Sequence, residues 1–119
     1  MGQGRVLLVS TNLFFVPRIH GAAAANGLGL RMTTSEADFW KAYAEGDVSL
    51  ILVDLEGEKG LWTKVVSGLK PERKAVTKVI AFGPHADVAL LEEARALGCD
   101  QVLSKNQFNK DLAKVLKPG

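Results

Sequence analysis

Five residues that could define a chemical site come at or just after the ends of short apolar runs: Ser10, Thr11, Asp54, Gly83 and Lys105. A carboxylate that faces a lysine forms a stable ion pair, which is costly to break from one side. We therefore predict that Asp54 and Lys105 lie in contact at one edge of the fold. Ser10 and Thr11 would bring only neutral hydroxyl groups to that edge.

Short runs rich in Val, Ile and Leu predict the strands that would position these residues. The runs are Arg5 to Val9, Leu28 to Thr33, Leu50 to Val53, Lys78 to Phe82 and Gln101 to Leu103. The first, third and fourth runs are almost continuously apolar, which is typical of parallel strands covered by helices on both faces. We expect these three strands to be central.

Segments with a helical spacing of apolar residues lie between the runs. The clearest examples contain Trp62, Val65, Val66 and Leu69 and, near the C-terminus, Phe108, Leu112, Val115 and Leu116. Helix ends are also indicated, by Gly27, Gly46 and Gly98 as C-terminal stops and by Ser35 with Asp38 as an N-terminal capping pair. The chain thus alternates between strand and helix.

This alternation predicts a single α/β domain that spans residues 1–119. Its expected architecture is a three-layer, doubly wound, five-stranded parallel sheet of flavodoxin-like order, 2-1-3-4-5. Ligands of such sheets bind at the carboxyl ends of the strands, near the switch point between the first and third strands. The five residues named first would share that rim.

Composition and motifs argue against several functional classes. The chain has 15 basic and 13 acidic residues, a net charge of +2, which is too small to indicate a nucleic-acid or membrane partner. Because Cys99 is the lone cysteine and no export leader is recognisable, we expect a cytoplasmic protein. No glycine-rich phosphate loop follows the first strand and no nucleophile has a histidine base, so we expect no enzymatic activity.

Four segments of the chain have a specific order and spacing. They are Val6 to Val9 followed by a polar pair, Ile51 to Asp54, Leu97 to Asp100, and Val102 to Lys105. Together they resemble the receiver domains of two-component response regulators over essentially the whole chain. The resemblance implies that Asp54 stands at the phosphoacceptor position and Lys105 at the position of the family's invariant lysine.

The same resemblance implies a degenerate phosphorylation pocket. In the family, an acidic pair after the first strand and the acceptor aspartate hold Mg²⁺, but here the pair is replaced by Ser10 and Thr11. Gly83 replaces the Ser or Thr that contacts the phosphoryl group, and Val102 replaces the aromatic residue whose rotamer reports phosphorylation. Asn106 stands where a proline normally follows the lysine.

We therefore expect a stand-alone pseudo-receiver, a protein–protein interaction module of bacterial signal transduction without conventional aspartyl phosphorylation. A residually phosphorylatable receiver that uses Asp54 stays open, as does a small-ligand-binding flavodoxin-like domain. No cofactor is expected, although Asp54 and Glu56 together could hold a weak Mg²⁺ ion. The family habit implies a signalling partner on the fourth helix, fifth strand and fifth helix, and leaves a homodimer open.

Three surface features receive an interpretation from the sequence. Lys110, Lys114 and Lys117 recur at helical spacing, as on a solvated helix face, and docking to an acidic or phosphorylated partner is the alternative. His85 is interpreted as a loop residue and His20 as a surface residue. Phe39 and Trp40 are adjacent in the second helical segment, so we expect one of these aromatic side chains to be exposed.

Overall fold

Five parallel strands form one sheet in the order β2-β1-β3-β4-β5, as the sequence predicted. The computed structural model describes residues 4–10, 16–72 and 77–116, apart from the side chains of Lys59, Lys70, Pro71 and Glu72. Its elements are β1 (Arg5–Val9), α1 (Val16–Ala25), β2 (Gly29–Thr33), α2 (Glu36–Ala44), β3 (Val48–Asp54), α3 (Lys59–Glu72), β4 (Lys78–Gly83), α4 (Val88–Ala96), β5 (Gln101–Ser104), α5 (Lys105–Lys110) and α6 (Leu112–Val115).

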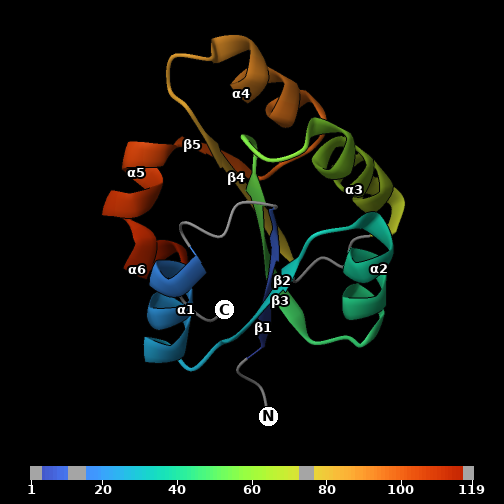
Figure 1. Ribbon diagram of the computed structural model, residues 1–119, viewed down its shortest axis with the longest axis vertical. Helices are drawn as coiled ribbons and strands as arrows, with labels where there is room; N and C mark the ends of the chain where they lie inside the picture. The colour runs from blue at the N-terminus through green and yellow to red at the C-terminus, as the bar shows by residue number, and fades with distance from the viewer. Residues whose placement is uncertain (1–3, 11–15, 73–76, 117–119) are drawn as a thin grey trace.

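Helices cover both faces of this sheet, and alternate residues of each strand enter different cores (Figure 1). Leu7 and Val9 of β1 pack with residues from α2, α3 and α4, whereas Val6 and Leu8 pack with residues from α1, α5 and α6. This double coverage is why β1, β3 and β4 have almost no polar residue along their length. These three strands are therefore packed by helices on both faces.

The helix ends agree with the signals in the sequence. Gly27, Gly46 and Gly98 follow α1, α2 and α4 with φ angles of 74°, 84° and 107°, a region that glycine adopts without steric cost. The Ser35 side chain accepts a hydrogen bond from the Asp38 backbone N–H at 3.1 Å. The Asp38 carboxylate does not complete a reciprocal capping box, because it pairs with Arg31 at 2.8 Å.

The C-terminal segment differs from the single helix that its spacing predicted. It divides into α5 and α6 at Asp111, which leaves helical geometry with φ −102° and ψ 19°. The Asp111 backbone N–H still donates to the Gln107 carbonyl at 2.9 Å, which closes the last turn of α5. The apolar spacing survives the break, since Phe108, Leu112 and Leu116 are all buried.

The expectation that Phe39 or Trp40 is exposed was wrong. Phe39 is fully buried, and Trp40 is half-buried against the core that lies between α2 and α3. Gly68 of α3 makes this possible, because a β-carbon at Gly68 would lie 2.7 Å from Trp40 Cζ2. Because Gly68 has no side chain, the Trp40 indole ring packs against α3. The spacing of apolar residues within α2 does not reveal this contact.

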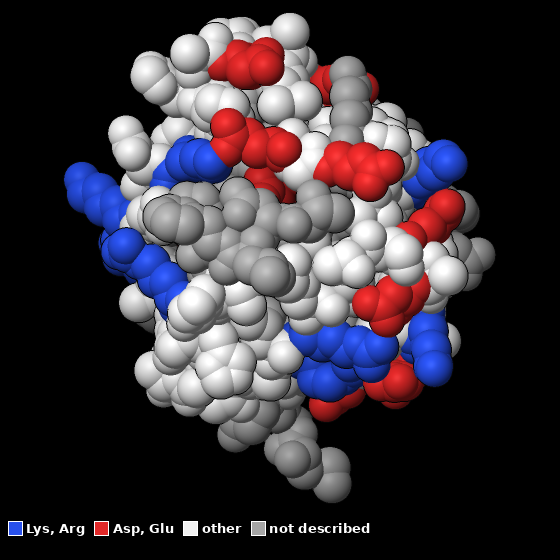
Figure 2. All heavy atoms as spheres, in the orientation of Figure 1, with Lys and Arg blue, Asp and Glu red and all other residues white. Residues whose placement is uncertain are grey.

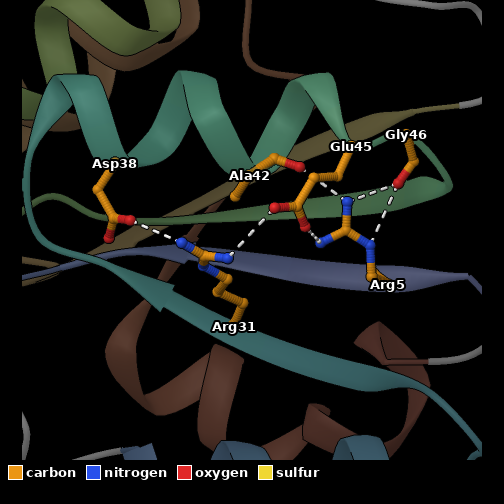
Figure 3. Close-up of polar contacts among 6 residues, drawn as sticks. All are labelled: Arg5, Arg31, Asp38, Ala42, Glu45 and Gly46. Carbon is orange, nitrogen blue, oxygen red and sulfur yellow. Dashed lines mark hydrogen bonds and ion pairs between the residues drawn. The ribbon is translucent and has the colours of Figure 1, made fainter.

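At the opposite end of the sheet from the rim, Arg5 ties β1 to the end of α2 (Figure 3). Its guanidinium donates to the Ala42 carbonyl at 2.7 Å and, through two nitrogens, to the Gly46 carbonyl at 2.5 and 3.2 Å. The Ala42 carbonyl also accepts the Glu45 N–H at 3.3 Å, and the Gly46 carbonyl lies just beyond the helix, so the guanidinium adds a cationic donor where it complements the helix dipole. Glu45 adds a looser ion pair with Arg5 at 3.8 Å.

The packing of Trp40 against Gly68 predicts opposite effects for two glycine substitutions. Gly68→Ala should lower the free energy of unfolding by about 1–3 kcal/mol, because the added methyl group displaces the indole ring. Gly21→Ala in α1 has open space around the added carbon and should raise the free energy of unfolding by about 0.5–1 kcal/mol. Urea titration followed by circular dichroism measures both values, and equal gains would show that Trp40 does not rest on α3.

The contacts of Arg5 predict that its hydrogen bonds matter more than its ion pair. Arg5→Met keeps the aliphatic stem but leaves the helix carbonyls without this donor, and should cost about 1–3 kcal/mol of unfolding free energy. Glu45→Gln removes two long ion pairs, with Arg5 at 3.8 Å and with Arg31 at 3.7 Å, from a side chain that is itself 52% exposed, and should cost about 1 kcal/mol or less. Thermal unfolding in low and high salt tests the ranking, which would be reversed if the ion pair were dominant.

Candidate functional site

The carboxyl ends of β1, β3, β4 and β5 bring the predicted site residues to one rim. Ser10 follows β1, Asp54 ends β3, Gly83 ends β4, and Lys105 begins α5 directly after β5. The parallel register fixes their heights, because Asp54 is level with Phe82 and Gly83 is level with Ser104. Thr11, the remaining residue of this predicted group, lies outside the described residues.

Asp54 is buried at the centre of this rim, with 2% of its surface exposed. Its Oδ2 accepts a hydrogen bond from Ser10 Oγ at 2.9 Å, and its Oδ1 accepts one from the Glu56 backbone N–H at 3.0 Å. The Gly57 N–H closes the turn onto the Asp54 carbonyl at 3.2 Å. Both carboxylate oxygens are thus engaged by the chain itself.

Lys105 forms an ion pair with Glu56, the residue two positions after Asp54. Its positive charge also acts on Asp54 through space. The sequence predicted a direct Asp54–Lys105 pair, and the structure instead gives Lys105 the flanking carboxylate as its ion-pair partner. Because the Lys105 and Glu56 side chains are 28% and 38% exposed, water screens this pair and its strength is modest.

Burial dominates the protonation of Asp54 and raises the pKa of its carboxyl group above the usual value. The Ser10 hydroxyl and the Lys105 charge both act in the opposite direction, but they do not outweigh the loss of water. The charged carboxylate is therefore a net cost to the fold at neutral pH. A purely structural ion pair would have lowered the pKa instead.

Gly83 ends β4 and Val102 lies on β5, and the sequence resemblance assigned these two positions to switching side chains. A β-carbon at Gly83 would lie 3.1 Å from Leu55 Cβ and 3.3 Å from Leu55 Cδ1, and Leu55 is itself 2% exposed. Val102 on β5 is partly buried against the core shared by α3 and α4. The end of β4 at Gly83 is thus bordered by a packed leucine.

The start of α5 differs from a loop shaped by a proline, because Asn106 is helical. Ser104 caps the helix, its side chain accepting a hydrogen bond from the Gln107 N–H at 3.1 Å, so that α5 begins at Lys105 with no intervening loop. Sequence reasoning missed this role of Ser104 and the role of Leu55. Ser104 lies three residues before Gln107, so its capping role could have been predicted from the sequence. The contact of Leu55 with Gly83 joins two strands and has no local signal in the sequence.

The remaining candidates predicted from the sequence lie on exposed turns and helices. His85 and His20 are exposed, as expected for loop and surface residues. Lys110 and Lys114 are exposed on α5 and α6, and Lys117 lies outside the described residues. Figure 2 shows basic side chains gathered at the left edge, on the side where Figure 1 places α5 and α6.

Within residues 4–10, 16–72 and 77–116, no group of three or more His, Cys, Asp or Glu side chains could hold a metal ion. The two carboxylates suggested for Mg²⁺ are Asp54, which bonds Ser10, and Glu56, which pairs with Lys105. A small divalent cation needs charged oxygen ligands that are free to face it. Among the rim residues that we describe, both of these carboxylates already have partners within the chain.

Comparison with known proteins finds no matching family model and no matching curated protein. Solved structures do match. The response regulator receiver domain from Clostridium thermocellum has a TM-score of 0.77 at 16% identity, covering 95% of this chain and 90% of that one. A putative response regulator from Chloroflexus aurantiacus has a TM-score of 0.79 at 12% identity, covering 95% and 97%.

The chain has the receiver fold. A further similar structure is a Burkholderia pseudomallei response regulator with a phosphorylated aspartic acid and a calcium ion, at 17% identity and a TM-score of 0.77. It covers 96% of this chain, which spans 66% of that longer protein. The predicted flavodoxin-like architecture is confirmed, and no helix in the described part of this receiver fold is long and apolar enough to cross a membrane.

The raised pKa of Asp54 predicts how stability depends on pH. The folded state holds this proton more tightly than the unfolded state, so the Asp54 contribution to stability is lost as pH rises from about 3.8 to the raised pKa and is constant above it. Asp54→Asn should therefore raise the free energy of unfolding at pH 7, on the order of 1 kcal/mol, because a neutral amide keeps hydrogen-bonding capacity. The gain should disappear below about pH 3.8.

Urea unfolding of both proteins across this pH range measures the difference. Ser10→Ala is the matched control, since it removes a hydrogen bond that favours the charged carboxylate and should raise the pKa of Asp54 further. A loss of several kcal/mol in Asp54→Asn at pH 7 would instead show that the carboxylate is held by a structural ion pair.

Proposed function

We propose that the chain is a pseudo-receiver, a protein-interaction module of bacterial signal transduction that works without conventional aspartyl phosphorylation. The observation that supports this most directly is the state of Asp54, which is 2% exposed and has a hydrogen bond on each carboxylate oxygen. An acceptor must present an oxygen to the incoming phosphorus atom. Here both oxygens are turned toward the chain.

Ser10 explains how the pocket stays together without a metal ion. Neighbouring carboxylates at such a rim would repel one another unless a cation lay between them. A hydroxyl at position 10 instead donates a hydrogen bond to Asp54, so β1 and β3 are joined directly at this point. The arrangement needs no divalent ion for its stability, which removes the usual coupling between metal binding and phosphoryl transfer.

Glu56 and Lys105 support the same proposal. The lysine of a working pocket would need to turn its ammonium group toward the transferred phosphoryl group, but here it forms an ion pair with Glu56. The Glu56 carboxylate is in turn directed to Lys105, so it is not free to act as a metal ligand. Lys105 and Glu56 thus neutralise each other beside Asp54 without any exogenous ligand.

A domain without this chemistry would act by binding another protein. We place the partner surface on α4, β5 and α5, where Val88 is a large apolar side chain that is 63% exposed at the start of α4. Lys110 lies exposed on α5 and Lys114 on α6. The exposed apolar residue on α4 and the basic residues on α5 and α6 suit a signalling partner with a mixed apolar and acidic surface, or a second copy of this chain.

A residually phosphorylatable receiver is the second candidate, and one observation favours it. Burial raises the pKa of Asp54, so the charged carboxylate lowers the stability of the fold. Stability alone therefore does not explain why an aspartate occupies this position. A function of the carboxylate oxygens would give such a reason. A small ligand bound at the same rim is the third candidate.

Titration with beryllofluoride and Mg²⁺, followed by amide NMR, separates the three candidates. Beryllofluoride imitates a phosphoryl group on an aspartate, so we expect no change in the amide spectrum of this chain. Mg²⁺-dependent shifts around Asp54 that disappear in Asp54→Asn would support the second candidate. Shifts with phosphate or nucleotides in the absence of beryllofluoride would support the third.

Acetyl phosphate with Mg²⁺ gives an independent measurement. We expect no added phosphoryl mass on the intact protein, and a gain of about 80 Da that Asp54→Asn abolishes would contradict the pseudo-receiver proposal. Asp54→Asn is a matched control because it retains the shape of the side chain and a hydrogen-bond acceptor for the Glu56 N–H.

A further inference from the structure

Two buried phenylalanines connect the end of β4 to α5. Phe82 and Phe108 are each 1% exposed, and their rings stack with centroids 4.1 Å apart and planes 7° apart. Both side chains belong to the core on the side of the sheet that α1, α5 and α6 cover. Aromatic pairs stabilise a contact beyond the apolar area that they bury. The stack therefore joins α5 to β4 at one defined point.

The β4 end of this stack is tied to the turn that follows Asp54. Phe82 is level with Asp54 in the parallel register of β3 and β4. The Phe82 carbonyl accepts a hydrogen bond from the Leu55 backbone N–H at 2.9 Å. The main chain of Phe82 is thus bonded to the residue between Asp54 and Glu56, and its ring has a defined position relative to both carboxylates.

The position of α5 depends on Phe108. All residues of α5, Lys105–Lys110, are described, and Phe108 is the one whose side chain is buried. A helix this short is not stable in water by itself, so packing decides how it rests on the sheet. Lys105 lies three residues before Phe108, which places both on the same side of the helix. A displacement of Phe108 would therefore move Lys105 as well.

We propose that the stack of Phe82 and Phe108 positions Lys105 beside Glu56 at the rim. The ion pair between Lys105 and Glu56 is partly exposed and screened by water, so it fixes the lysine only weakly by itself. Packing supplies what the ion pair lacks, because the stack links α5 to the strand that holds the Asp54 turn. This inference goes beyond the proposed function and applies whether or not Asp54 accepts a phosphoryl group.

NMR of the full chain at pH 7 tests this role with a readout that stability alone does not change. Lys105→Met removes the ammonium group, and the resulting change in the ¹³C shift of the Glu56 carboxyl group reports how closely the two side chains are held. On a Phe108→Leu background this change should fall to about half of its original size or less, because leucine cannot stack on Phe82.

Phe39→Leu is the matched control. It makes the same substitution at a fully buried phenylalanine in the core on the other face of the sheet. The response of Glu56 to Lys105→Met should keep its full size on this background, although stability falls. An equal loss of response in Phe39→Leu would show a general loosening of the fold and would overturn the proposal.

Phe82→Leu removes the stack from the β4 side without a change in α5. It should reduce the response of Glu56 as Phe108→Leu does, and the two substitutions together should reduce it no further than either alone. A response of full size in either variant, with folding verified by circular dichroism, would refute the role of the stack. A beryllofluoride response of the unmodified chain would contradict the proposed function but leave this result unaffected.

Discussion

The hydrogen bond from Ser10 Oγ to Asp54 Oδ2 is the interaction on which the organisation of the rim depends. It joins the ends of two neighbouring central strands, β1 and β3, at a point where water is excluded and where a second carboxylate would need a cation beside it. The neutral Ser10 hydroxyl donates to Asp54 and adds no second negative charge beside it. Asp54 then needs no ion pair with Lys105, whose ammonium group pairs with Glu56.

The two ends of the sheet use charge differently. Arg5, at the amino ends of the strands, donates to main-chain carbonyls at the end of α2, and its geometry is fixed by those acceptors. At the carboxyl ends, Asp54 is deeply buried and its pKa is raised, so its charge is unfavourable despite two hydrogen bonds. The contacts of Arg5 at the amino ends of the strands stabilise the fold. At the carboxyl ends, the buried charge of Asp54 lowers the stability of the fold.

The sequence predicted the fold well because buried parallel strands and helix stops are local signals. The runs ending at Val9 and Phe82 and the stop at Gly46 needed no knowledge of the tertiary structure. It also predicted that Ser10, Asp54, Gly83 and Lys105 would come to one rim, because strand order decides this, but it paired Lys105 with Asp54, whereas the ion pair is with Glu56. It failed where two elements distant in sequence fit together: Trp40 rests on Gly68, and Leu55 rests on Gly83. Periodicity within one helix or strand cannot show such pairs.

The case of Gly83 shows how the structure adds a packing constraint to a position that the sequence interprets only by resemblance. In the sequence, a glycine in place of a hydroxyl residue is a simple loss. In the structure its missing β-carbon is matched by a leucine that fills the neighbouring space and is bonded to the same strand. Packed interiors respond to single carbons, so the two positions are constrained together. A side chain added at position 83 would therefore require Leu55 to shift by a few tenths of an ångström.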